Sequence, residues 1–340
     1  YLRLVLTGEV ATEVSDASGT GLFDVRERKW SDDLLIRLPF GAEILPDCFE
    51  SDVVSGQVSP SAAKLFGLPA GTPVIGGGGD SVIQTLGSGV VEPGVLQTTI
   101  GTAGIAAAAL RTPEKNPDGR LQVFCNVAPN LWHCMGVSLN AGGALNWLRG
   151  AQGDCRDFDT MIAGAGQVGP GASGLLFLPY LNGERCPHPD PKARGAFVGL
   201  SARHDGRHMT RALMEGVTFA LYDMYRLMCR IGLQTDLIKA SGGGVKSTLW
   251  RQIQADLFNC PVVTTEGAAE GAAFGAALLA GVTDGAWTGM AEAARCCREL
   301  TREEPMRAQG EVYRKAHGIY AELYETLRPS LHALTELEAE

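Results

Sequence analysis

The most regular hydrophobic pattern in the chain lies between residues 208 and 231. Apolar side chains recur there at intervals of three and four residues, at Met209, Leu213, Val217, Leu221, Met224 and Met228. This spacing places them on one face of a helix. Gly232 follows the last of them and is a typical helix stop. The pattern therefore predicts a long helix over residues 208–231.

Shorter apolar runs bounded by glycine, proline or polar residues predict strands. We expect these strands at residues 73–75, 94–100, 105–108, 121–126, 132–138, 174–179, 237–240 and 262–263. Helices are predicted over residues 81–89, 143–149, 247–258, 271–279 and 310–327. The glycine turn at residues 101–104 joins the second and third strands as a hairpin. Strands and helices that alternate around such a hairpin predict an α/β fold with a mixed sheet.

The first 70 residues are more polar and richer in turns than the rest. They begin with a helical segment, continue with a turn at residues 15–20, and contain a short helix that opens at residues 30–34. Four prolines keep the elements short, namely Pro39, Pro46, Pro60 and Pro69. We therefore expect this stretch to be organised separately from the part that follows residue 72.

Length and composition limit the possible classes of protein. At roughly 150 residues per domain, 340 residues correspond to about two domains. The chain has 45% hydrophobic and 20% charged residues, which indicates a folded globular protein. No apolar run is long enough to span a membrane. The net charge of −9 and the lack of a Lys/Arg run argue against a nucleic-acid partner.

Nine cysteines are scattered along the chain without a CxxC pair, at Cys48, Cys125, Cys134, Cys155, Cys186, Cys229, Cys260, Cys296 and Cys297. This pattern predicts buried free thiols in a reducing cytoplasm, with neither a disulfide framework nor a zinc site. The six histidines show no metal-ligand spacing and are predicted to be surface or capping residues. The sequence therefore predicts no protein-built metal site.

Glycine is in excess, with 44 residues, and much of the excess is clustered. Residues 164–169 match GxGxxG, but a helical segment at residues 157–162 precedes them where a dinucleotide site needs a strand. We interpret this match as a loop. Residues 242–247 resemble the end of a phosphate-binding P-loop, yet Val245 stands where glycine must precede lysine. Both familiar nucleotide motifs are therefore rejected.

The remaining clusters surround a single carboxylate. Asp80 follows Gly76–Gly79 at the end of a predicted strand and the start of a predicted helix. It could be a helix cap, or a base that accepts the proton of a hydroxyl attacking a phosphoryl group. Four glycines favour the second alternative, because they suit a ligand lying against the main chain.

Two further glycine segments could hold an anion or a nucleotide. Residues 101–104 offer turn amides and the Thr102 hydroxyl to phosphate oxygens, or form an ordinary hairpin turn. Residues 242–244 precede a helix and could bound a nucleotide, or form a flexible link. Together with Asp80 they suggest a kinase of the actin-like type.

Specific motifs extend this pattern along the whole chain. They lie at residues 77–80, 100–104, 181–187, 193–200 and 241–256, and a further series runs from Gly195 through Phe197, Gly199, Leu200, His208 and Met209 to Glu215. With these residues in this order, the chain resembles the FGGY family of carbohydrate kinases, most closely its xylulokinases. The resemblance implies two ribonuclease H-like domains of the actin-like ATPase type, with ATP and sugar in the cleft between them.

The resemblance also implies roles for individual residues. Asp80 matches the catalytic base, and Ser81 the neighbouring sugar contact. Gly101 and Thr102 match the loop around the ATP phosphates. The other implied nucleotide contacts are Gly142, Asn146, Gly243, Gly244 and Ser247. Mg²⁺ is expected to bridge phosphate oxygens mainly through water, so few protein ligands are needed.

By this resemblance, residues 1–72 are the tail of the family's first domain and residues 73–340 are its complete second domain. Tyr1 is not an initiator methionine, and the family's first phosphate hairpin would precede it. We therefore expect a fragment in which the first domain is only partly present. A homodimer is the commonest assembly for such soluble enzymes.

The implied reaction is ATP-dependent phosphorylation of a ketopentose hydroxyl, with D-xylulose as the first choice. Ser81 occupies a position where xylulokinases usually have asparagine, which weakens the substrate assignment more than the reaction type. Kinases for glycerol, ribulose or gluconate, and a catalytically silent actin-fold binding module, remain alternatives. Glu184, Arg185 and Arg194 lie in a Pro/Gly-rich loop and are expected to form a structural ion pair.

Overall fold

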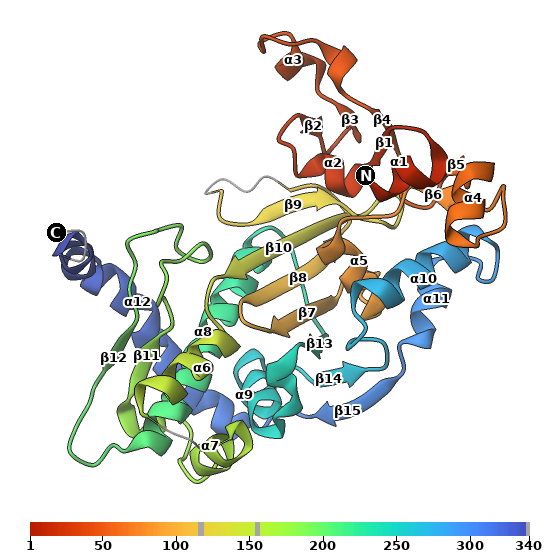
Figure 1. Ribbon diagram of the computed structural model, residues 1–340. Helices are drawn as coiled ribbons and strands as arrows, with labels where there is room; N and C mark the ends of the chain where they lie inside the picture. The colour runs from red at the N-terminus through yellow and green to blue at the C-terminus, as the bar shows by residue number, and fades with distance from the viewer. Residues whose placement is uncertain (115–118, 154–156, 338–340) are drawn as a thin grey trace.

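A seven-stranded mixed sheet forms the centre of the protein in the computed structural model, which describes residues 1–114, 119–153 and 157–337 (Figure 1). Its strands are β7 (Val95–Ile100), β8 (Gly104–Leu110), β9 (Gln122–Cys125), β10 (Trp132–Ser138), β13 (Leu237–Ser241), β14 (Val262–Thr265) and β15 (Glu299–Glu303). Their order is β15-β14-β13-β7-β8-β10-β9.

The sheet has an antiparallel half and a parallel half. The antiparallel half begins with the predicted hairpin of β7 and β8, and β10 and β9 continue it. On the other side of β7, β13 and β14 run parallel to it and to each other, and β15 closes the edge in the antiparallel direction. The predicted α/β fold with a mixed sheet is thus confirmed.

Helices cover both faces of the sheet, and each face has its own hydrophobic core. One face packs against α6 (Gly142–Ala151), α8 (Gly206–Arg230), α9 (Thr248–Phe258) and α12 (Arg307–Leu337). The other packs against α5 (Asp80–Gly87), α10 (Ala272–Thr283) and α11 (Met290–Ala293). Figure 1 shows these two groups on opposite sides of the strands.

Helices α5 and α10 lie unusually close together. A Cβ atom on Gly275 of α10 would collide with the carbonyl oxygen of Ile83 in α5, so only glycine allows this approach. The run of small residues at 271–279 predicts such a packing, and the structure confirms it. The contact fixes α5, whose first residue is Asp80, against α10.

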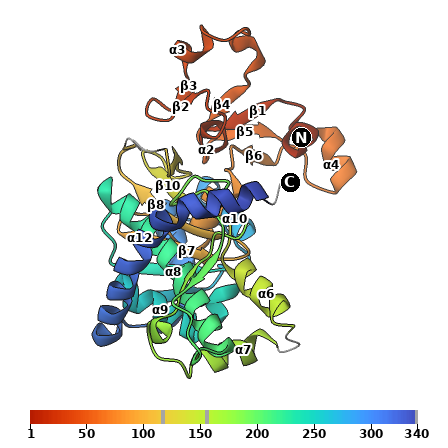
Figure 2. The same cartoon turned by 90° about the vertical axis from the view of Figure 1, so that its left-hand side faces the viewer.

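The N-terminal segment forms a separate layer beside the sheet, in red and orange in Figures 1 and 2. Its helices are α1 (Leu2–Thr7), α2 (Val14–Ser18), α3 (Asp32–Leu35) and α4 (Pro60–Phe66). Its strands are β1 (Ala11–Glu13), β2 (Phe23–Asp24), β3 (Lys29–Trp30), β4 (Asp47–Phe49), β5 (Val54–Gln57) and β6 (Pro73–Ile75). Strand β6 pairs with β5 and not with the large sheet, so the strand expected to open the second domain belongs to this layer.

Some elements differ from the sequence predictions. The turn expected at residues 15–20 is largely the helix α2, because the Glu13 carboxylate caps it by accepting the amides of Ser15 and Asp16. The segment at residues 164–169 begins inside α7 (Phe158–Ala165), so a helix stands where a dinucleotide site would need a strand. Strands β12 (Ala196–Val198) and β15 were not predicted, since β15 is mostly charged and polar. The buried strand predicted at residues 174–179 is β11 (Leu176–Leu178), which pairs with β12.

The cysteine and histidine predictions hold only in part. The cysteines of the described ranges are free thiols, but Cys229 is exposed, and Cys155 lies outside the described residues. His208 is a capping residue of α8, as predicted. His133 and His317 are buried, which corrects their assignment to the surface. Among the described residues no helix is long and apolar enough to cross a membrane.

Candidate active site

The site begins where β7 and β13 end. These strands are adjacent and parallel, so their carboxyl ends meet at one edge, with Thr99 opposite Ser241. The turn at residues 101–104 therefore lies beside the segment 242–244. A Cβ atom on Gly242 would lie 2.6 Å from the carbonyl oxygen of Ile100, so glycine is required for this approach. The topology thus brings together two of the three predicted glycine segments, residues 101–104 and residues 242–244.

The start of α6 completes this edge. The amide of Gly142 donates to the carbonyl oxygen of Gly101 at 2.8 Å, and the amide of Ala141 donates to that of Thr102 at 2.8 Å. Gly101, Thr102 and Gly142, all predicted to contact nucleotide, therefore form one backbone unit. The Thr102 side chain is exposed, so its hydroxyl is accessible to a ligand.

A cavity of about 650 Å³ opens along this edge between the end of β13 and helices α5 and α10. Its walls include Gln84, Ser241, Gly242, Gly243, Lys246, Arg251, Thr265, Ala268, Gly271 and Leu300. The wall at Arg251 is held by a buried ion pair, in which Arg251 Nη2 and Glu303 Oε1 are 2.7 Å apart. This pair joins α9 to β15 and so holds this part of the cavity wall in place.

Asp80 is the first residue of α5 and is exposed. The N-cap of that helix is Gly79, so Asp80 is not the cap that the sequence left open as an alternative. Its Oδ1 accepts the amide of Ser81 at 2.6 Å, and its Oδ2 has no hydrogen bond within the described ranges. Gln84 lines the cavity, and four residues of helix rise only about 6 Å. Asp80 therefore lies one helical turn from a residue of the cavity wall, although it does not itself line the cavity.

The four glycines before Asp80 have a structural use. The amides of Gly76 and Gly77 donate to the carbonyl oxygens of Val53 and Ser51, and the amide of Gly79 donates to Ser15 Oγ. A Cβ atom on Gly76 would lie 2.5 Å from the carbonyl oxygen of Glu50. Three of the four amides are thus already bound within the protein, and contact of this run with a ligand stays a prediction. The glycines of this run allow two backbone segments to pack closely and so fix the approach to Asp80.

Of the predicted site residues, only Gly243 is among the described residues that line the cavity. Ser81, Asn146, Gly244 and Ser247 have other surroundings. Ser247 caps α9, with its Oγ accepting the amide of Trp250 at 3.1 Å. Asn146 is exposed on α6, and its Oδ1 accepts a hydrogen bond from Arg149 at 3.2 Å. Gly244 packs against the side chain of Ile100. Ser81 is half-buried next to Asp80. Their proposed ligand contacts stay predictions.

The sequence did not single out several residues of the cavity wall. Gln84 lies one helical turn after Asp80, so helical spacing was a signal that could have found it. Lys246 belongs to the rejected P-loop-like motif and was not assigned a role of its own. Leu300 comes from the edge strand β15 and Thr265 from its neighbour β14, and no local motif marks either position.

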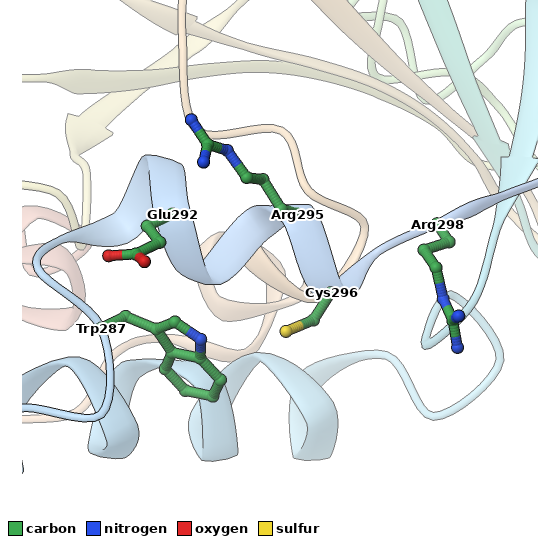
Figure 3. Close-up of a pocket in the computed structure, with 5 residues that line it drawn as sticks. All are labelled: Trp287, Glu292, Arg295, Cys296 and Arg298. Atoms are coloured by element: carbon green, nitrogen blue, oxygen red, sulfur yellow. The ribbon is translucent and has the colours of Figure 1, made fainter.

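Two other features carry none of the predicted site residues. A second cavity, of about 440 Å³, is lined by Trp287, Glu292, Arg295, Cys296 and Arg298 at α11 (Figure 3). Glu184 has a structural role, as expected, but through backbone amides, since its Oε1 accepts from Leu139 and Arg185 at 2.9 and 2.7 Å. Burial raises the pKa of Glu184 to about 7.

Two family models match the chain. Residues 96–283 match the C-terminal domain of the FGGY family of carbohydrate kinases, and residues 1–87 match the N-terminal domain of the same family. The chain belongs to the FGGY family of carbohydrate kinases. The N-terminal match extends past the boundary expected at residue 72 and includes Asp80. The division of the chain at residue 72 stays a prediction, and β6 pairs with β5 of the N-terminal layer.

The FGGY chain is similar to xylulose kinases along most of its length. It is 33% identical to the xylulose kinase of Bacillus subtilis over 325 residues, which are 95% of this chain and 65% of that relative. A crystal structure of the xylulose kinase of Brucella ovis superposes with a TM-score of 0.89 at 34% identity, covering 98% of this chain and 68% of that one. The gluconate kinase of Lactobacillus acidophilus superposes with a TM-score of 0.93 at 28% identity, covering 98% and 68%.

Proposed function

We propose that the protein transfers the γ-phosphoryl group of ATP to a ketopentose hydroxyl, with D-xylulose as substrate and D-xylulose 5-phosphate as product. The observation that carries the proposal is the position of Asp80. It is an exposed carboxylate with one unbound oxygen, one helical turn from a residue of the cavity wall. Similarity to xylulose kinases over nearly the whole chain supports the choice of sugar.

In the proposed reaction Asp80 Oδ2 accepts the proton of the sugar hydroxyl as that oxygen attacks the γ-phosphorus. The adenosine part of ATP would lie in the cavity beside Gly242 and Gly243, and the phosphates near the amides of the turn at Gly101 and Thr102. The cavity has space for a nucleotide, and no amide of residues 242–244 donates to another segment within the described ranges. Mg²⁺, when bound to ATP, would neutralise charge on the phosphate oxygens.

The structure offers this Mg²⁺ few direct ligands. Within the described ranges, no three or more His, Cys, Asp or Glu side chains are grouped so that they could hold a metal ion. An ion carried by ATP and water suits such a site. The proposal also includes a cytoplasmic location and the possibility of a homodimer.

Gluconate is the second candidate substrate. The superposition on a gluconate kinase favours it. Ser81, which stands beside Asp80 where xylulokinases usually have asparagine, weakens the choice of xylulose without selecting another sugar. A panel of D-xylulose, D-ribulose, glycerol and gluconate, followed by ADP release, separates these substrates. The highest kcat/KM on D-xylulose supports the proposal, whereas the highest value on gluconate replaces the substrate and leaves the reaction type unchanged.

Replacement of Asp80 by asparagine tests the reaction itself. We expect Asp80→Asn to lower kcat by about 10² to 10⁴, because the variant lacks the general base. Nucleotide affinity should stay within about twofold, since the phosphate-binding turn is untouched. Asp159→Asn is the control, because Asp159 is an exposed carboxylate in the first turn of α7. Full turnover in Asp80→Asn contradicts the proposed role, and no ATP binding by the wild type favours a silent binding module.

A further inference from the structure

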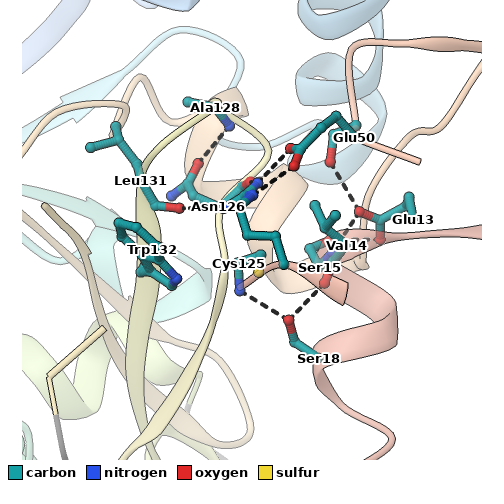
Figure 4. Close-up of polar contacts among 12 residues, drawn as sticks. Glu13, Val14, Ser15, Ser18, Glu50, Cys125, Asn126, Ala128, Leu131 and Trp132 are labelled. Atoms are coloured by element: carbon teal, nitrogen blue, oxygen red, sulfur yellow. Dashed lines mark hydrogen bonds and ion pairs between the residues drawn. The ribbon is translucent and has the colours of Figure 1, made fainter. Parts of the chain in front are cut away.

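A buried chain of hydrogen bonds leads from the N-terminal layer to the backbone just before Asp80. It starts at Glu13, a carboxylate that is only 4% exposed. Glu13 accepts four hydrogen bonds, from the amides of Ser15 and Asp16 and from the hydroxyls of Ser15 and Ser51, at 2.6 to 2.9 Å. Figure 4 shows Glu13 and Ser15 within this cluster. Such a set of donors holds a carboxylate in one orientation.

Ser15 transmits this orientation to the loop at residues 76–79. Its hydroxyl donates to Glu13 Oε1 at 2.7 Å, so its single hydrogen is already committed. The oxygen therefore presents lone pairs on its other side, where it accepts the amide of Gly79 at 2.9 Å. Gly79 immediately precedes Asp80 and is the N-cap of α5.

This contact differs from the other anchors of the same loop. Gly76 and Gly77 are held by backbone carbonyls, which no side-chain substitution removes. Gly79 is held by a side chain, and it has no side chain of its own to limit its backbone dihedrals. The anchor nearest to the carboxylate of Asp80 therefore depends on the Ser15 hydroxyl and on the Glu13 carboxylate that orients it.

We propose that Ser15 and Glu13 are positioning residues, which hold the Gly79 amide and thereby keep Asp80 in register with the attacking hydroxyl. The inference rests on the proposed kinase function and adds to it two residues from outside the cavity. Burial raises the pKa of Glu13, and the hydrogen bonds from Ser15, Asp16 and Ser51 oppose this effect. Such positioning has large kinetic consequences, because a displacement of about 1 Å at a reacting group can cost about 10²-fold in rate.

The same helix provides a matched control. Ser18 is also on α2, also buried, and also accepts a backbone amide from outside the N-terminal layer, that of Cys125 in β9 at 3.0 Å. Figure 4 shows this contact. Ser18 therefore attaches α2 to the sheet at β9, whereas Ser15 attaches α2 to the loop before Asp80. A simple loss of attachment should affect both serines alike.

The test compares Ser15→Ala, Ser18→Ala and Glu13→Gln in the complete protein. We expect Ser15→Ala to lower kcat by about tenfold to a hundredfold, with the KM for ATP within about twofold. Ser18→Ala should leave kcat within about threefold. Adding Glu13→Gln to Ser15→Ala should lower kcat no further, because both residues act through one hydroxyl. Hydrogen exchange of the Gly79 amide should be faster in Ser15→Ala than in Ser18→Ala.

Each alternative outcome is informative. Equal losses of kcat in Ser15→Ala and Ser18→Ala would show that both serines only attach the N-terminal layer to the rest of the protein. That result would overturn the inference. The inference is also overturned if the wild type is active and Ser15→Ala changes neither kcat nor the exchange rate of the Gly79 amide. The proposed function stands in that case. A wild type without kinase activity on any sugar of the panel refutes the proposed function, and the positioning role for Asp80 falls with it.

Discussion

Residues 76–79 and residues 242–244 are both runs of glycine at the end of a strand and ahead of a helical segment. In the first run, three amides are bound by the N-terminal layer. In the second, the three amides make no hydrogen bond to another segment within the described ranges, and Gly242 and Gly243 line the large cavity. The first run thus packs backbone against backbone, whereas the second is open toward a ligand.

The difference shows that a glycine run has no fixed meaning. Glycine permits close approach, and whether a ligand or another part of the chain makes that approach depends on the surroundings. Around residues 76–79 the neighbour is the segment at residues 50–53. Around residues 242–244 the parallel pairing of β7 and β13 leaves an open edge. Three experiments sharpen this contrast between an interior run and an open run.

Of the three effects, we expect the largest from acid, which should lower the free energy of unfolding through the core behind residues 76–79. Gly78 packs against Val127 of the core under α5, and His133 on β10 faces the same core, since it pairs with Phe124. Complete burial lowers the pKa of His133 to about 4, whereas an unfolded histidine titrates near 6.5. Between these values the unfolded state binds more protons, so stability falls as pH falls, by about 3 kcal/mol in total.

Urea unfolding at several pH values between about 4 and 7 measures this loss. His133→Phe has no titratable nitrogen and should remove this part of the pH dependence. The substitution His133→Phe should leave the open edge at residues 242–244 unchanged, because His133 is not a residue of the cavity wall. Equal pH slopes for the wild type and His133→Phe would refute the prediction.

Gly76→Ala should have the next largest effect. The new methyl group would lie 2.5 Å from the Glu50 carbonyl oxygen, and a backbone atom does not move aside cheaply. We expect a loss of about 1 to 3 kcal/mol in the free energy of unfolding, as for other overpacked sites. Thermal and urea unfolding measure it. An unchanged stability would mean that the first run is as open as the second.

Gly243→Ala should have the smallest effect on stability. A Cβ atom on Gly243 meets nothing within 4 Å, so the free energy of unfolding should change by less than about 0.5 kcal/mol. Because the methyl group points into open space beside the cavity, we expect a several-fold rise in the KM for ATP. Isothermal titration with a nucleotide measures the change in affinity. A large loss of stability without a change in affinity would break the comparison.

Much of the fold was predictable from local pattern. The hairpin of β7 and β8, the strand β10 and the long helix α8 were all predicted within a few residues of their bounds. Strand β15 was not, because Leu300 is its only apolar residue and its pairing with β14 decides its conformation. The helix α2 was missed because the cap that begins it is a glutamate, where serine, threonine, aspartate or asparagine is the usual signal.

The candidate site was predictable in its chemistry and less so in its geometry. The sequence singled out Asp80, Thr102 and Gly243, and the structure places Asp80 one helical turn from a wall residue of the cavity that Gly243 lines, and Thr102 beside the same sheet edge. It did not reveal Ser15 or Glu13, which lie more than sixty residues before Asp80. No local spacing marks two residues that meet a loop only after the N-terminal layer has packed against it.

The sequence by itself determined the alternation of strands and helices, the family and the carboxylate suited to act as a base, because periodicity and ordered motifs are local properties of the chain. Tertiary structure alone decided which glycines face a ligand, which backbone amides are already bound and which hydroxyl holds the loop before Asp80. The physical reason is that an amide has one hydrogen to donate, and only the packing of distant segments determines which acceptor takes it.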